Sequence, residues 1–200
     1  MSPRLGVYLE VGAKRVFASA ADWPGWCRQG KTEQSAIETL AAYAPRYAKV
    51  AKLARLELPK DPTFHVVERQ AGDATTDFGA PHIPANAEWR PSAKDLERML
   101  SLVEASWTYL DQVMARSPAG LRKGPRGGGR DRDKMYAHVL DAETAYASAI
   151  GLRLKKLDRA ALREALRHPA KHTKWPVAYA MRRIAWHALD HAWEIEDRLP

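Results

Sequence analysis

Alternating apolar and polar residues at the start of the chain predict strands. Residues 4–11 alternate with a period of two, which is typical of a strand with one buried face. The next four residues suit a hairpin turn, and residues 16–20 are predicted to form a second strand. A third strand is predicted at residues 64–68. These strands indicate a small sheet in the first part of the chain.

A helix is predicted between the second and the third strand. Thr32 is a suitable N-cap, and apolar residues follow it at helical spacing through Tyr43 or beyond. Pro45 is expected to end or to kink this helix. The preceding residues, 22–31, are interpreted as a loop. Residues 1–70 are therefore expected to form a small α+β domain.

The pattern changes between residues 71 and 91, where no period is found and prolines accumulate. We interpret this segment, 71–91, as a linker or a wrapped loop. From Ser92 onward the spacing is helical, and four helices are predicted, the third of them short. They favour a helical bundle over residues 92–200. Their approximate limits are 92–117, 132–152, 159–167 and 176–199.

Side chains at the predicted helix ends support these limits. Ser92 and Asp95 have the spacing of a capping box. Asp158 is suited to cap the short helix, and Pro169 to stop it. The helix at 132–152 has an apolar face whose predicted members are Met135, Val139, Ala142, Tyr146 and Ala149.

Composition narrows the class of protein. A chain of 200 residues that is 46% hydrophobic can bury a core of useful size. It contains no run of roughly 18 apolar residues that could span a membrane, and its first residues lack the apolar segment of a signal peptide. A cytoplasmic location without a membrane partner is therefore expected. The single cysteine, Cys27, cannot form an internal disulfide and is expected to be buried.

The net charge of +8 raises the question of a nucleic-acid partner. Much of the excess lies in one glycine- and proline-rich segment, 116–134, which contains no aromatic residue that could stack on bases. We interpret it as a solvated basic loop, and nucleic acid is not the expected partner. Its basic residues are Arg116, Arg122, Lys123, Arg126, Arg130, Arg132 and Lys134.

Three histidines carry the strongest chemical signal. His187 and His191 are four residues apart on the last predicted helix, so they lie on one side of it, one turn apart. His138 occupies the matching edge of the apolar face of another helix. Three imidazoles that leave one position open are typical of a catalytic metal, whereas a structural zinc usually has four protein ligands. The three histidines are therefore the candidate metal ligands.

Two interpretations of these histidines stay open on spacing alone. They could be hydrogen-bonded residues at the edge of the core, because pairs four residues apart also arise by chance. Nearby carboxylates favour the metal, since a ligating imidazole usually donates its other N–H to such a group. The carboxylates in question are Asp141, Asp190 and Glu194.

The second half of the chain resembles a known family. The stretch AHVLDAETAYASAIG around His138 and the C-terminal WHALDHAWEIEDR are similar to the DinB/YfiT-like superfamily of metal-binding four-helix bundles. The resemblance covers residues 92–200. It implies that His138, His187 and His191 bind a divalent metal, zinc or nickel.

The resemblance also implies a function. Members with assigned activities include transferases and isomerases that use a low-molecular-weight thiol such as mycothiol or bacillithiol. This chain is accordingly expected to be a metal-dependent transferase or hydrolase acting on a small-molecule substrate. Glu194 and Asp141 are alternatives for a base or for a residue that supports a ligand, and the sequence does not choose between them.

The first half of the chain has a resemblance of its own. The stretch from Tyr8 to Tyr43 is similar to the HicB-like fold, with Pro24-Gly25 and Gly30-Lys31-Thr32 as the matching points. The expected fold class is thus α+β, a HicB-like domain followed by an all-α DinB-like bundle. The alternative function is a non-catalytic HicB-like interaction module in which the histidines are structural.

Two tryptophans give the last helix a second apolar side. Trp186 and Trp193 are seven residues apart and lie away from its main apolar face. A helix that is apolar on two sides is usually buried on two sides. The tryptophan side is expected to pack on the N-terminal domain or on a second subunit, which would make the protein a homodimer.

Overall fold

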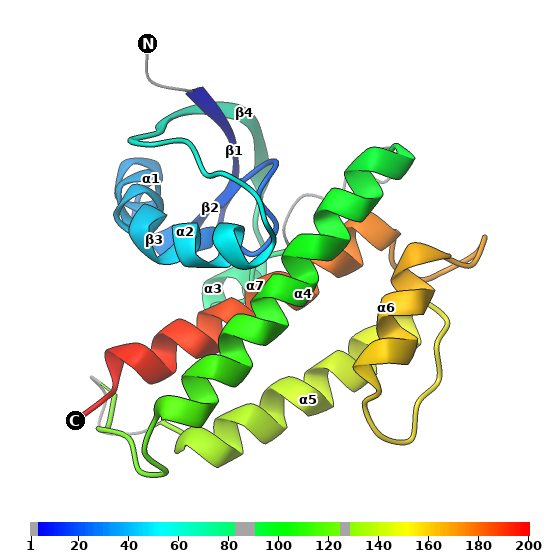
Figure 1. Cartoon of the computed structure of the whole chain (residues 1–200). Coiled ribbons are helices and arrows are strands. Elements are labelled where there is room, and N and C mark those ends of the chain that lie inside the picture. Colours follow the sequence, from blue (N-terminus) through cyan, green and yellow to red (C-terminus); the bar gives the residue numbers. More distant parts are fainter. Residues whose placement is uncertain (1–3, 83–90, 125–128) are drawn as a thin grey trace.

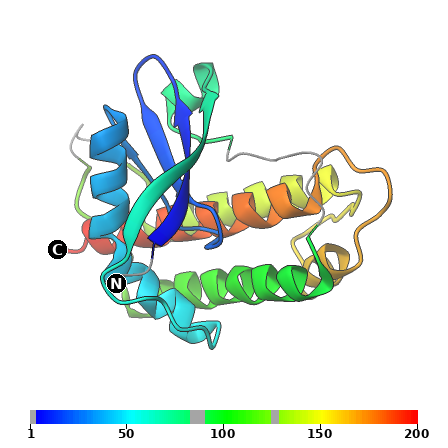
Figure 2. The same cartoon turned by 90° about the horizontal axis from the view of Figure 1, so that it is seen from above.

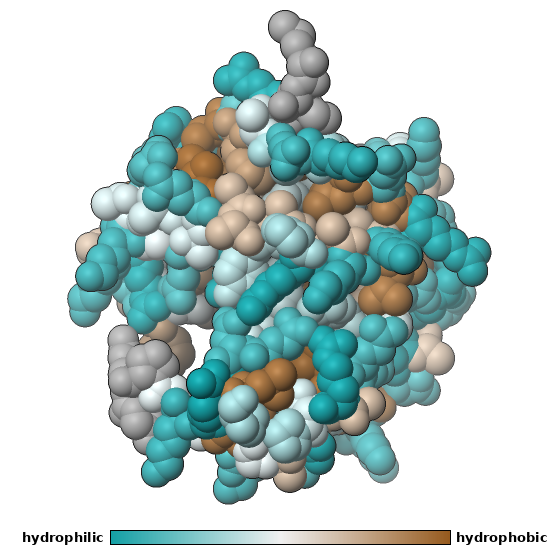
Figure 3. All heavy atoms as spheres, turned by 60° about the vertical axis from the view of Figure 1, so that its left-hand side comes forward, coloured by the Kyte–Doolittle hydropathy of each residue, from teal (hydrophilic) through white to brown (hydrophobic). Residues whose placement is uncertain are grey.

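The computed structural model describes residues 4–82, 91–124 and 129–200. A four-stranded sheet near the N-terminus is followed mostly by helices, so the fold is α+β (Figure 1). Within the described residues no helix is both long enough and apolar enough to cross a membrane. The surface seen in Figure 3 is mostly hydrophilic, and polar side chains break its apolar areas into separate patches.

The sheet has the strand order β3-β2-β1-β4. Strands β1 (Arg4–Val11), β2 (Val16–Ala20) and β4 (Thr63–Ala71) confirm the three predicted strands. The interpretation of residues 22–31 as a loop was wrong in part, because β3 (Cys27–Gly30) pairs antiparallel with β2. Four residues are too few to show a period, so only the pairing reveals this strand. Strand β1 pairs antiparallel with β2 and parallel with β4.

Two helices lie between β3 and β4 in the chain; the first packs on the sheet, and the second packs on a helix of the second half. Helix α1 (Glu33–Ala42) begins where Thr32 accepts a hydrogen bond from the Ser35 N–H, as predicted. The chain then turns at Tyr43 and continues as α2 (Ala44–Leu53), which has proline in its first turn. A proline at that position lacks only an N–H that has no intrahelical partner, so it starts a helix as readily as it ends one.

The predicted linker at 71–91 contains ordered structure, which corrects that interpretation. Its first residue belongs to β4, and a five-residue helix, α3 (Ala74–Phe78), follows. The buried Glu10 accepts hydrogen bonds from the Thr76 hydroxyl and from the His82 N–H, the latter at 2.7 Å. Side-chain contacts rather than an apolar period hold this segment, so periodicity does not reveal it. The part of the linker at 83–90 lies outside the described residues.

Four helices form the second half of the chain, as predicted. They are α4 (Ala93–Arg116), α5 (Arg132–Ala149), α6 (Arg159–Arg167) and α7 (Val177–Asp197). Ser92 and Asp95 form the expected capping box, and Asp158 accepts hydrogen bonds from the first turn of α6. In Figures 1 and 2, α4 and α5 run alongside α7, and α6 lies at one end of them.

Helix α7 connects the two halves of the protein. It packs on α4 and α5 and also reaches the sheet, where Trp186 joins Phe17 and Cys27 in a buried cluster. The Trp193 ring contacts the Tyr43 ring with centroids 5.0 Å apart. The tryptophan side therefore packs on the N-terminal part of the same chain, which confirms the first of the two alternatives. One apolar core extends from the sheet to the helices and fixes α7 between them.

Candidate metal centre

Helices α5 and α7 bring the three predicted histidines together. His187 and His191 lie one turn apart on α7, and their Nε2 atoms are 3.2 Å apart. The His138 ring, on α5, lies with its centroid 5.1 Å from the ring centroid of each of the other two. One ligand atom from each residue lies within 4.8 Å of the other two. This spacing is close enough for one metal ion to be bound by all three.

Burial keeps His138 and His187 neutral. His187 is 7% exposed, and the His191 side chain is 12% exposed. Burial, reinforced by the other two imidazoles, lowers the pKa of His187 to about 2. Burial also lowers the pKa of His138, which is only partly buried. Since the neutral imidazole is the form that binds a metal, His138 and His187 are in their ligand form at neutral pH.

The Nδ1 atom of His191 contacts a carboxylate. The Nδ1 atom of His191 lies 3.2 Å from Oε2 of Glu194, and Arg198 donates to the other carboxylate oxygen at 3.1 Å. The hydrogen bond from His191, followed by that from Arg198, lowers the pKa of Glu194. An ionised Glu194 favours the tautomer with the proton on Nδ1, which leaves Nε2 of His191 free to face the cluster.

Arg198 also links the basic segment to this site. Its buried guanidinium donates to the backbone oxygens of Arg122, at 2.7 Å, and Arg130, at 2.8 Å. The side chains of Arg122, Lys123 and Arg130 are exposed, as expected for a solvated segment, but this backbone is anchored. The predicted loop is therefore attached to the candidate site at both of these points. Arg126 lies outside the described residues.

The other predicted carboxylates are placed differently. Asp190 forms an ion pair with Arg28 at 2.9 Å rather than supporting a histidine. Asp141 is exposed, and its charge opposes the fall in the pKa of His138. Of the three carboxylates expected to support a ligand, Glu194 is the one with a hydrogen bond to a histidine.

The predicted apolar face of α5 also needs correction. Its buried residues are Met135, Val139, Glu143 and Ala147, so the face is rotated from the predicted one and includes a carboxylate. Trp107 Nε1 donates to Glu143 at 2.8 Å, and Arg159 Nε donates to it at 3.2 Å. The buried face could have been recognised from the residues at every fourth position from Met135 onward. It was missed because an acidic residue is seldom assigned to a core.

Sequence reasoning also missed a group of residues beside His187. The Arg183 guanidinium lies 4.8 Å from the Trp186 ring centroid and 5.8 Å from that of Tyr146. The Tyr146 ring in turn lies 5.8 Å from the His187 ring. Arg183 precedes His187 by four residues, which places the two on one side of α7 and could have suggested the contact.

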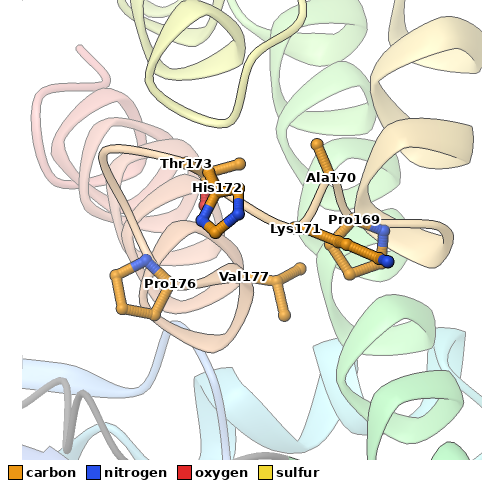
Figure 4. Close-up of a pocket in the computed structure, with 7 residues that line it drawn as sticks. All are labelled: Pro169, Ala170, Lys171, His172, Thr173, Pro176 and Val177. Carbon is orange, nitrogen blue, oxygen red and sulfur yellow. The ribbon is translucent and has the colours of Figure 1, made fainter.

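The cavity in Figure 4 lies away from the histidine cluster. It has a volume of about 720 Å³ and is lined by residues 169–173, 176 and 177, at the connection between α6 and α7. Figure 4 shows His172 beside Thr173 at its edge. None of the three clustered histidines lines it. The cavity therefore provides no pocket for a substrate of the candidate metal.

No family model, curated protein or solved structure matches this chain.

Proposed function

We propose that the protein binds one divalent metal ion, zinc or nickel, through His138, His187 and His191. The convergence of the three imidazoles supports this most directly. Two nitrogens that bind a tetrahedral zinc at its usual bond length lie roughly 3.3 Å apart. The Nε2 atoms of His187 and His191 are separated by 3.2 Å. The third ligand atom is within 4.8 Å, so a bound ion would need only a small inward movement of the rings.

A simple hydrogen bond between His187 and His191 would also fit their separation. It would leave His138, which lies against both rings, without a role in the cluster. Buried polar atoms cost free energy unless they are satisfied, and one hydrogen bond cannot satisfy three converging imidazole nitrogens. One cation satisfies all three. The metal is therefore the better account of the cluster.

The proposed activity is that of a metal-dependent transferase or hydrolase acting on a small molecule, with a low-molecular-weight thiol as its co-substrate class. Three protein ligands leave one position open, as in catalytic zinc sites. A bound divalent ion would lower the pKa of a coordinated water or thiol, or would polarise a carbonyl group. Within the chain, Glu194 orients His191, and Arg198 orients Glu194. They are positioning residues in this proposal.

The test is a zinc titration of the full chain in competition with a chromophoric chelator. The parent protein is expected to take up one equivalent, and His138→Ala is expected to weaken the affinity by at least a hundredfold. His172→Ala is the matched control because His172 is exposed and lies outside the cluster. Equal affinity in the parent, in His138→Ala and in His172→Ala would refute the proposal.

A further inference from the structure

Positive charge surrounds the candidate metal centre. Arg183 lies one turn before His187, with its guanidinium over the Trp186 ring at 4.8 Å from the ring centroid. It donates to the backbone oxygen of Pro81. Among the described residues it forms no ion pair with a carboxylate, and its Nε atom is buried without a hydrogen-bond partner. Arg183 is thus a partly buried cation whose charge is not balanced by a carboxylate among the described residues.

A second cation acts on the cluster from the other end. This cation is Arg130, whose backbone oxygen accepts a hydrogen bond from the same Arg198 nitrogen that donates to Glu194 beside His191. Its side chain is exposed and, among the described residues, forms no ion pair with a carboxylate. The backbone of Arg130 is fixed by its hydrogen bond from Arg198 at 2.8 Å. The fold therefore holds the backbone of Arg130 beside the site.

The nearby carboxylates do not offset these charges. Glu194 is already paired with Arg198 at 3.1 Å and hydrogen bonded to His191. Asp141 is exposed to water, where its charge is screened. Neutral imidazoles leave the two positive charges of a bound ion uncompensated. Such a site attracts an anion, and partial burial makes the attraction stronger than it would be in water.

We propose that the open coordination position takes a small oxyanion, a carboxylate or a phosphate group, whose charge Arg183 and Arg130 balance. This inference rests on the proposed metal site and specifies the class of ligand it selects. Arg183 presents a planar guanidinium, which matches both oxyanions, and Trp186 and Tyr146 hold it against their rings. A substrate that binds the metal would accordingly carry a negative charge.

The test uses the full chain loaded with cobalt(II), whose visible absorption reports the ligands of the metal. Acetate and inorganic phosphate are titrated separately at constant ionic strength, with acetamide as the uncharged counterpart of acetate. We expect saturable spectral changes with at least one anion and none with acetamide. Whichever anion binds more tightly identifies the oxyanion.

Substitutions then assign the role of the two arginines. Arg183→Gln and Arg130→Gln are each expected to weaken anion affinity about tenfold, a size set by charges several ångströms apart in a partly buried site. Arg153→Gln removes the same charge at an exposed position and serves as the control. Arg130 is exposed, so Arg130→Gln is expected to leave the fold intact. Its result therefore tests the inference even if Arg183→Gln disturbs the fold.

The failure of this inference can be told apart from the failure of the metal site. Cobalt that binds but responds to neither anion, or that responds equally in all three variants and the parent, would overturn the inference and leave the metal site intact. A parent protein that takes up no cobalt would refute both.

Discussion

Glu143 offers a quantitative test of how the core of the helical half is built. Its side chain is fully buried and contacts Trp107 and Arg159. Burial favours the neutral carboxylic acid, whereas the Arg159 charge and the two hydrogen bonds favour the carboxylate. Burial is the larger effect, and the pKa of Glu143 rises from 4.5 to about 7.

The rise fixes the sign of the pH dependence. Because the folded protein holds the proton more tightly than the unfolded chain, the contribution of Glu143 to stability is complete below pH 4.5 and is lost as the pH rises to about 7. The difference between the two pKa values corresponds to a loss of about 3 kcal/mol. The loss should be complete by about pH 8.

The assay is urea unfolding of the parent and of Glu143→Gln between pH 4 and pH 8. Glutamine has nearly the same shape but does not titrate, and the histidines titrate alike in both proteins. The free energy of unfolding of the parent, relative to the variant, is predicted to fall by about 3 kcal/mol over this range. A relative stability that rises with pH would show that the Arg159 ion pair outweighs burial, and a constant one would show that Glu143 does not titrate as described.

Three further predictions test the surroundings of the site. Glu194→Gln is expected to weaken zinc affinity by roughly 10- to 100-fold in the chelator competition. Arg116→Ala is the control and is expected to leave the affinity unchanged, because Arg116 pairs with Glu196 and does not contact a histidine. Gly25→Ala is expected to lower the free energy of urea unfolding by about 2–4 kcal/mol, because Gly25 has a φ of +91° and its Cβ would lie 2.7 Å from a side chain of α7. Gly120→Ala, where a Cβ meets nothing within 4 Å, is its control, and equal losses would contradict the packing described. Cys27 is expected to react with a thiol reagent only after unfolding, because burial raises its pKa to about 12, and rapid reaction of the native protein would contradict that burial.

The long helices could be predicted from the sequence because their signals are local. An apolar period that continues over several turns, together with caps such as Ser92 and Asp158, needs no knowledge of the rest of the fold. Strand β3 and helix α3 are too short for such a period. Pairing with β2 and hydrogen bonds to Glu10 hold them, and both depend on residues distant in the sequence.

The candidate site was predictable to the same extent. The spacing of His187 and His191 follows from the helix alone. His138 was found from its place at the edge of an apolar face of which Met135 and Val139 are buried as predicted. The contributions of Arg130 and Arg183 depend on how the segments around them fold back on α5 and α7. The sequence spacing does not indicate which arginine side chains will lie without a carboxylate beside them in the folded protein.

The three-histidine centre is tested most directly by loading the purified protein with zinc, measuring its metal content by elemental mass spectrometry and recording the zinc X-ray absorption spectrum. The account predicts about one equivalent of zinc bound by three imidazole nitrogens at roughly 2.0–2.1 Å, with a further light ligand at the open position. The equivalent is predicted to be lost in His138→Ala and in His191→Ala while both variants remain folded. Zinc that is absent from the parent, or that is bound with the same stoichiometry in both variants, would contradict the account.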